Sequence, residues 1–184
     1  MHVVDELTRL AHAARTGNDD AVREFVQASQ RDVWRLCAHL VDRDAASDLA
    51  QETYLRALPA LRRFRGDASA RTWLLAIGRR VCADELRGRY RRPEDLTDAH
   101  VDTVASVDFA AHSDLLALVD MLEPERRAVF VLTQLLGCSY EETATITGTP
   151  IGTVRSRVAR ARGDLIAWAS SDQGHAARGN TSTR

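Results

Sequence analysis

Apolar residues recur every three to four positions along nearly the whole chain, which is the spacing of one face of an α-helix. We find no convincing run in which apolar and polar residues alternate, as they would in a half-buried strand. The helical pattern covers 4–14, 19–41, 46–58, 70–91, 113–119, 124–137, 139–148 and 150–165. The sequence therefore predicts an all-α protein.

A stretch without this periodicity divides the pattern into two parts. It begins near Pro93, runs to about 112, and is acidic and rich in Thr, Asp and Ala. The last residues, SSDQGHAARGNTSTR, carry no apolar stripe. We predict two small helical domains, 1–92 and 113–169, joined by a flexible acidic linker, 93–112, and followed by a disordered tail, 170–184.

Charge is segregated along the 184 residues although the net charge is only −1. Residues 62–92 hold ten arginines against Asp67, Asp84 and Glu85, a net charge of +7, whereas 93–123 hold eight acidic residues and no arginine. Residues 149–165 are again basic, with four arginines against one aspartate. Two basic segments separated by an acidic one indicate two contacts with a polyanion.

Several classes of protein are disfavoured by composition. No apolar run approaches the roughly 20 residues of a membrane helix, and the N-terminus lacks a signal-peptide core, so we expect a cytoplasmic protein. Three widely spaced cysteines indicate neither a disulfide framework nor a structural zinc site. No HExxH, glycine-rich phosphate loop or nucleophile elbow occurs. We therefore expect no enzymatic activity, no metal and no cofactor.

The segment 139–165 has the pattern of a helix-turn-helix. Ser139 and Glu142 form a capping box, Ala144 is small where two helices would cross, and Gly148 suits a left-handed turn. The second helix would bury a stripe formed by Ile151, Val154, Val158, Ala161 and Leu165. In such a motif the second helix enters the DNA major groove with its N-terminal end toward the bases.

The opposite side of this second helix carries a strip of small residues with arginines along its edges. The strip consists of Gly152, Ser156, Ala159 and Gly163. Two glycines cost a helix about 1 kcal/mol each relative to alanine, so a solvent-facing helix has little reason to keep them. Close approach to DNA explains the strip, while a basic helix facing only solvent, or a buried hairpin without a ligand, stays an alternative.

Several motifs, in order, resemble extracytoplasmic-function (ECF) sigma factors of bacterial RNA polymerase. SYEETATITGTPIGTVRSRVARARGDL resembles their −35-reading region, and LEPERRAVFVLTQLLGCSYEE looks like the preceding part of the same sigma-4 domain. DLAQETYLRAL and FRGDASARTWLLAIGRRVCADELR resemble sigma region 2. The chain departs from the family at Thr143 and Thr147, where larger apolar residues are usual, and at Arg80, where asparagine is frequent.

The resemblance implies a sigma-2-like helical bundle, a sigma-4-like helix-turn-helix domain and three groups of functional residues. It places Asp48, Leu49, Gln51, Glu52, Tyr54 and Leu55 against core polymerase. It places Phe64, Arg65, Gly66, Asp67, Ser69, Trp73, Arg79, Arg80, Asp84 and Arg87 at the −10 element, with Arg62, Arg63 and Arg71 as phosphate contacts. It places Thr153, Arg155, Ser156, Arg157 and Arg160 at the −35 element.

The implied partners are core RNA polymerase, through its β′ clamp helices and β flap, and promoter DNA; many members also bind an anti-sigma factor. The implied function is a subunit that directs initiation and helps to melt the −10 region. The alternative is a stand-alone helix-turn-helix regulator whose first half senses a ligand or dimerises. The second basic segment argues against that alternative, because an effector domain does not need it.

Overall fold

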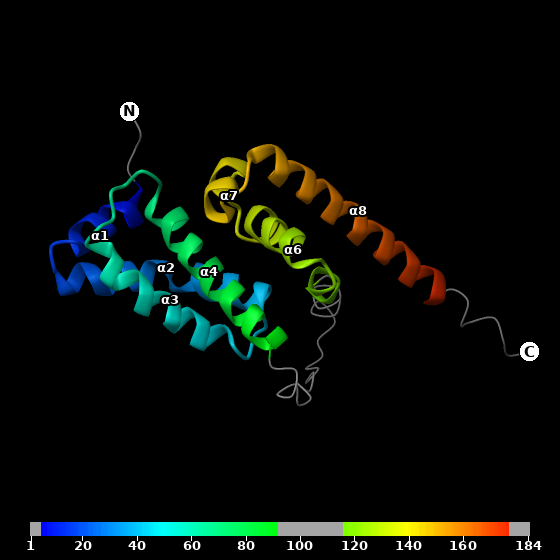
Figure 1. Cartoon of the computed structure of the whole chain (residues 1–184), viewed down its shortest axis with the longest axis horizontal. Coiled ribbons are helices and arrows are strands. Elements are labelled where there is room, and N and C mark those ends of the chain that lie inside the picture. The colour runs from blue at the N-terminus through cyan, green and yellow to red at the C-terminus, as the bar shows by residue number, and fades with distance from the viewer. Residues whose placement is uncertain (1–4, 92–115, 177–184) are drawn as a thin grey trace, which may run out of the picture.

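The computed structural model describes residues 5–91 and 116–176, and within these ranges every regular element is a helix (Figure 1). The prediction of an all-α fold is confirmed. None of the described helices is both long and apolar enough to cross a lipid bilayer. The predicted linker, 93–112, and the end of the chain, 177–184, lie outside the described residues.

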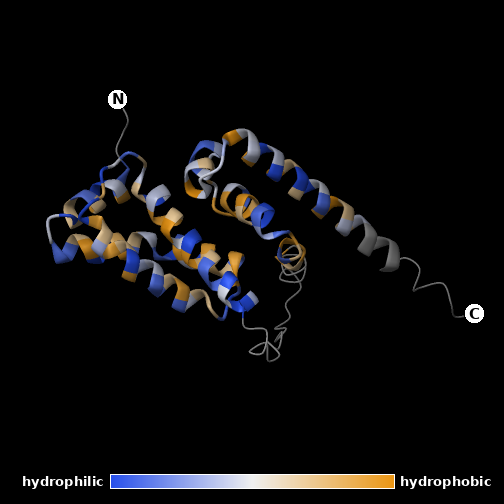
Figure 2. Cartoon of the chain, in the orientation of Figure 1, coloured by the Kyte–Doolittle hydropathy of each residue, from blue (hydrophilic) through white to orange (hydrophobic). Residues whose placement is uncertain are grey.

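The N-terminal half is a bundle of four helices: α1 (Glu6–Ala14), α2 (Asp19–Leu40), α3 (Ala46–Leu61) and α4 (Ala70–Arg91). The long helix α2 lies at its centre and contacts the other three. Figure 2 shows hydrophobic residues gathered where these helices face one another. The largest fully buried side chains of this half belong to Phe25, Val33, Leu36, Leu61, Leu74, Leu75 and Val81.

The predicted starts of α2 and α4 are confirmed by their caps. The Asn18 side chain accepts hydrogen bonds from the backbone N–H groups of Asp20 and Ala21. The Ser69 hydroxyl accepts one from the Thr72 N–H at 3.1 Å. Helix α3 extends to Leu61, slightly beyond the predicted 46–58, with Pro59 in its last turn. Proline removes one backbone hydrogen bond from a helix. Because Pro59 lies close to the C-terminal end of α3, the loss of this bond does not end the helix there.

The C-terminal half contains α6 (Pro124–Phe130), η2 (Val131–Leu135), α7 (Tyr140–Thr147) and α8 (Ile151–Ala176), preceded by a helical turn at 116–120. The sequence predicted one helix from Pro124 to Gly137, but the structure widens its second part into the π-helix η2. Helix α8 continues to Ala176, so the first part of the tail predicted to be disordered is helical instead.

The two halves contact each other directly. Helix α4 lies against α7 (Figure 1). Helix α2 lies against η2 and α6. Buried apolar residues of both halves, from Phe25 and Leu36 to Leu132 and Ile146, belong to one continuous cluster. The sequence predicted two domains on a linker and did not predict this contact.

Candidate nucleic-acid and protein interfaces

The helix-turn-helix is held in shape by the cap and the turn that its sequence predicted. The Ser139 hydroxyl accepts a hydrogen bond from the Glu142 N–H at 3.1 Å, and the Glu142 carboxylate accepts one from the Ser139 N–H at 2.7 Å. Gly148 has φ +65°, and its N–H bonds the Ala144 carbonyl. The capping box and the left-handed glycine are therefore confirmed.

Packing fixes which side of α8 faces outward. Val154 and Val158 are buried with Val129 of α6, and Tyr140 and Ala144 of α7 cover them. The family departures Thr143 and Thr147 are also buried, and the Thr147 hydroxyl donates to the Thr143 carbonyl at 2.7 Å. The interior therefore satisfies the Thr147 hydroxyl, whereas the buried Thr143 hydroxyl has no hydrogen-bond partner among the described residues.

The strip of small residues on α8 lies on the opposite, exposed side. Gly152, Ser156, Ala159 and Gly163 are all exposed. A Cβ atom built at Gly152 or Gly163 would meet nothing within 4 Å. No contact within the described part of the chain therefore requires glycine at either position. Since each glycine costs helix stability, the strip is better explained by close approach of something outside the chain.

The predicted −35 residues divide into two groups. Arg155 and Arg160 are exposed beside the strip, and Ser156 lies within it. Thr153 is half-buried, and its carbonyl accepts a hydrogen bond from the Ser156 hydroxyl at 3.0 Å. Arg157 turns toward α6, where its Nη1 atom lies 2.9 Å from the Glu125 carboxylate. Arg157 therefore links α8 to α6 through this ion pair. Its side chain does not lie beside the strip with Arg155 and Arg160.

Helix α3 presents part of the predicted polymerase-binding edge to solvent. Asp48, Gln51 and Leu55 are exposed, and Leu55 retains 62% of its accessible surface. Glu52 is half-buried and forms an ion pair with Arg56 at 2.7 Å.

Two residues predicted for this edge point the other way. Leu49 is buried in the bundle core, and the Tyr54 hydroxyl lies 2.8 Å from the Ser29 hydroxyl of α2. Leu49 and Tyr54 therefore pack α3 against the rest of the bundle. The surface of this edge that is available to a partner consists of Asp48, Gln51, Glu52 and Leu55.

The loop between α3 and α4 was predicted to hold a −10 base, and most of its residues are open. Arg65, Gly66 and Asp67 are exposed, whereas Ser69 is occupied as the cap of α4. Phe64 is only 3% exposed, with its ring 5.3 Å from those of both His12 and Trp73. Phe64 was predicted to lie at the −10 element, but its ring is part of the core, so a base cannot stack on it in this arrangement.

The predicted −10 residues of α4 lie on two different faces of the helix. Arg80, Asp84 and Arg87 are exposed together, and Asp84 pairs with Arg87 and, at 2.8 Å, with Arg56 of α3. The hydrogen bond from Arg56 holds the pKa of Asp84 below its ordinary value, so this carboxylate stays charged. Arg79 lies on the other face, only 21% exposed, with its guanidinium 3.5 Å from Glu125.

Sequence reasoning missed a cluster in which arginines of the N-terminal half bind the C-terminal half. Arg35 donates to the Leu135 carbonyl at 2.7 Å. Arg71, held by Asp32 at 2.6 Å, donates to the Leu136 carbonyl at 2.6 Å and to the Cys138 thiol at 3.4 Å. The acceptors are largely backbone carbonyls at the end of the π-helix η2, so no side-chain pattern could have identified Arg35.

Comparison with known proteins places both halves in one family. The family described as Sigma-70 region 2 matches residues 25–92, and Sigma-70, region 4 matches 112–165. The ECF RNA polymerase sigma factor SigC of Mycobacterium tuberculosis is 45% identical over 173 residues, which cover 91% of this chain and 94% of that protein. The chain belongs to the ECF sigma factors. The ECF sigma-E factor of Escherichia coli is 30% identical over 172 residues, covering 83% and 88%.

Solved structures agree with this family. CnrH, in complex with the cytosolic domain of CnrY, matches with a TM-score of 0.73 and 25% identity, covering 91% of this sigma factor and 99% of CnrH. RpoE of Bartonella quintana, in complex with the anti-sigma factor NepR, matches with a TM-score of 0.68 and 27% identity, covering 82% and 98%. The predicted family and the two-domain sigma fold are confirmed.

As an ECF sigma factor, the protein has RNA polymerase and promoter DNA as its partners, as the sequence predicted. The family consists of transcription initiation factors rather than enzymes. The three cysteines are free and buried, and no cluster of three His, Cys, Asp or Glu side chains suited to a metal occurs in residues 5–91 and 116–176.

The turn of the helix-turn-helix gives a direct test of the local geometry. Gly148→Ala places a Cβ at φ +65° and is expected to destabilise the protein by about 1–2 kcal/mol. Gly163→Ala lies within α8 at an ordinary helical φ and should instead stabilise it by up to about 1 kcal/mol. Urea unfolding followed by circular dichroism measures both. Equal effects of the two substitutions would contradict the assigned turn.

Proposed function

We propose that this sigma factor directs initiation at promoters with −35 and −10 elements and helps to melt the −10 region. Helix α8 reads the −35 element, the 62–69 loop and the open face of α4 engage the −10 element, and the exposed edge of α3 docks on the β′ clamp helices. The C-terminal half would meet the β flap.

The exposed strip on α8 carries the −35 part of this proposal. The strip has no packing role within the described chain, and it runs between the exposed arginines Arg155 and Arg160. Arginine donates to guanine edges and to phosphates, and small residues let a helix lie deep in the major groove.

Charge and exposure support the −10 part. The loop and the following helix carry a net charge of +7 over residues 62–92, and Arg65, Arg80 and Arg87 are exposed. A basic groove that follows a single strand stabilises melted DNA without catalysis. Phe64 is in the core, whereas Trp73, which packs against it, is only half-buried and is the better aromatic candidate for a contact with DNA.

A stand-alone regulator is the weaker proposal, because both halves match sigma regions and the first half has a basic surface of its own. An anti-sigma factor is a further candidate partner, since the similar RpoE of Bartonella quintana was solved with one.

Reconstituted transcription tests the proposed function. The protein is mixed with core polymerase and a pool of genomic fragments, and the 5′ ends of the transcripts are sequenced. We expect new 5′ ends that share one element near −10 and a second near −35, and none when the protein is omitted. Transcripts without shared upstream elements would refute promoter recognition.

A further inference from the structure

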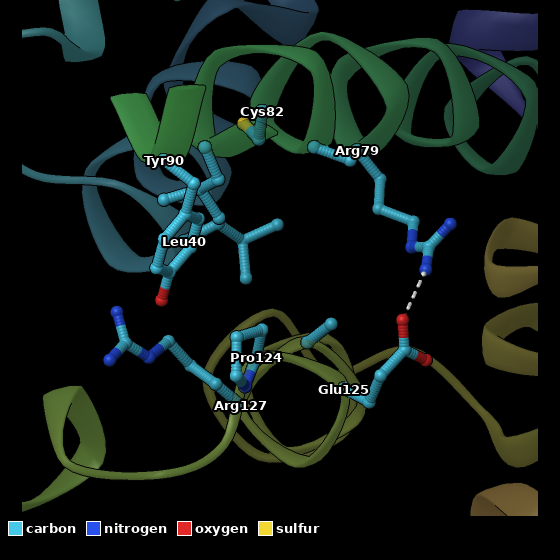
Figure 3. A pocket seen from close by; sticks show the side chains of 10 residues that line it. Leu40, Arg79, Cys82, Tyr90, Pro124, Glu125 and Arg127 are labelled. Atoms are coloured by element: carbon cyan, nitrogen blue, oxygen red, sulfur yellow. Dashed lines mark ion pairs between the residues drawn. The ribbon is translucent and has the colours of Figure 1, made fainter. Parts of the chain in front are cut away.

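A cavity of about 120 Å³ lies between α4 and α6 (Figure 3). Its inner wall is apolar, because it is lined by Leu40 of α2, Cys82 of α4 and Ala128 of α6, none of which is more than 6% exposed. Its outer side is lined by the exposed Pro124 and by Tyr90, which retains 80% of its accessible surface. The cavity is therefore a small pocket with an apolar interior and an aromatic ring beside its mouth.

Charged side chains stand on opposite sides of this cavity. Figure 3 shows Arg79 on one side and Arg127 on the other, with Glu125 across from Arg79. The Arg79–Glu125 ion pair is long, at 3.5 Å. Two arginines against one glutamate give the lining a net charge of +1, so the cavity favours an anion over a cation.

One donor of Arg127 has no partner. The Nη1 atom lies 3.6 Å from the Asp120 carboxylate, and the Nη2 atom donates to the Asp120 carbonyl. The Nε atom is buried and makes no hydrogen bond among the described residues. A buried N–H group without an acceptor destabilises the structure, and a bound molecule commonly supplies the acceptor. Because Arg127 lines the cavity, an anion held there can do so.

We propose that this cavity is a binding site for a small aromatic carboxylate. The ring would lie against the apolar wall beside Tyr90, and the carboxylate would accept hydrogen bonds from Arg127. The proposal is independent of the proposed function, because it concerns neither DNA nor polymerase. Since α4 and α6 belong to different halves of the chain, such a ligand would stabilise the contact between them by mass action.

The size and the lining of the cavity support this class of ligand. An apolar protein cavity of about 150 Å³ holds a benzene molecule, so the present one suits a single ring whose substituent extends toward the mouth. Small-molecule sites combine an apolar lining with a few polar groups that orient the ligand. The planar guanidinium of arginine matches a carboxylate, and aromatic rings such as that of Tyr90 pack against other rings.

Three small molecules separate the contributions of ring and charge. The full-length protein, labelled with ¹⁵N, is titrated at fixed ionic strength with benzoate, with its neutral analogue benzamide, and with acetate, which has the charge without the ring. Benzoate should bind with a Kd on the order of 1 mM, as expected for so small a ligand. Benzamide and acetate should bind at least about tenfold more weakly. The largest amide shifts should lie in 82–90 and 124–128.

Ala83→Leu tests whether the cavity holds the ring. Ala83 is half-buried and lines the cavity, so a leucine there fills the space that benzoate would occupy. Benzoate binding should weaken at least about tenfold. Ala76→Leu is the matched control, because Ala76 is also half-buried on α4 but does not line the cavity, and its affinity for benzoate should stay within about twofold. Circular dichroism confirms that both variants are folded.

Two further substitutions should change benzoate affinity in opposite directions. Arg127→Gln removes the proposed carboxylate donor and should weaken binding about tenfold, whereas Arg126→Gln, at a residue outside the lining, should not. Glu125→Gln removes the negative charge from the lining and should strengthen binding about two- to fivefold. Glu123→Gln removes the same charge at the start of α6, outside the lining, and should leave the affinity unchanged.

Three results would overturn the proposal. One is equal binding of benzoate and benzamide, which would remove the role of the arginines. Another is unchanged benzoate affinity in a folded Ala83→Leu variant, which would place the ligand elsewhere. The third is the absence of saturable shifts up to about 20 mM benzoate, which would leave the cavity to water. Because these titrations contain no DNA and no polymerase, their failure and the failure of the transcription experiment are distinguishable.

Discussion

Leu55→Asp is expected to lower the affinity for core RNA polymerase by at least about 30-fold while leaving the fold intact. Leu55 retains 62% of its accessible surface in the middle of α3, so nothing within the described chain accounts for an apolar side chain there. Apolar anchors at the centre of an interface contribute about 2 kcal/mol or more, and a buried unpaired carboxylate adds a further cost. Titration of fluorescently labelled protein with core polymerase measures the change.

The matched control is Ala28→Asp, which introduces the same charge at another exposed apolar position, on α2. Its affinity for core should stay within about twofold, since surface substitutions of this kind change free energies by roughly 0.5 kcal/mol or less. If both variants lost the same affinity for core polymerase, the loss would be due to the added negative charge and not to the edge of α3. Unchanged binding by Leu55→Asp would refute the docking surface.

Arg155→Ala is expected to weaken binding of the holoenzyme to promoters that depend on a −35 element by about 5- to 150-fold. Arg155 is exposed beside the small-residue strip at the N-terminal end of α8, the end that enters the groove. A good arginine–guanine contact contributes about 1–3 kcal/mol of discrimination. Promoter affinity and core affinity are measured separately, and core affinity should not change.

Arg162→Ala provides the comparison on the same helix. Its guanidinium donates to the Gln134 side chain at 2.8 Å and lies two turns further from the N-terminal end of α8. We expect a smaller loss of promoter affinity, of the kind that follows loss of one phosphate contact. A larger effect of Arg162→Ala than of Arg155→Ala would mean that α8 meets DNA with a different part of its length.

The local structure could be predicted because it depends on residues close together in sequence. Ser139 and Glu142 satisfy each other's backbone donors, and Gly148 takes the left-handed turn that the spacing predicted. The buried stripe of α8 follows from helical periodicity: Val154, Val158, Ala161 and Leu165 are buried as predicted, whereas Ile151 is only half-buried. The resemblance to sigma factors then gave the right family.

The errors arise where the outcome depends on three-dimensional neighbours. Arg157 is ion-paired because Glu125 of another helix faces it, and Phe64 is buried because His12 and Trp73 enclose its ring. Helical spacing places Arg79 and Arg80 about 100° apart on α4, but it could not show that Arg79 faces the C-terminal half and Arg80 faces solvent. The contact between the halves includes hydrogen bonds from Arg35 and Arg71 to backbone carbonyl groups, which no residue type encodes.

Permanganate footprinting of a promoter identified by the transcript 5′ ends shows whether this protein helps to open promoter DNA, because permanganate detects unpaired thymines. We expect reactive thymines near −10 only when core polymerase and this protein are both present, together with DNase I protection near −35. Protein or core alone should leave the thymines paired. Protection near −35 by the protein alone, with duplex DNA near −10 even when core is added, would contradict the assignment as an initiation factor and favour a stand-alone regulator.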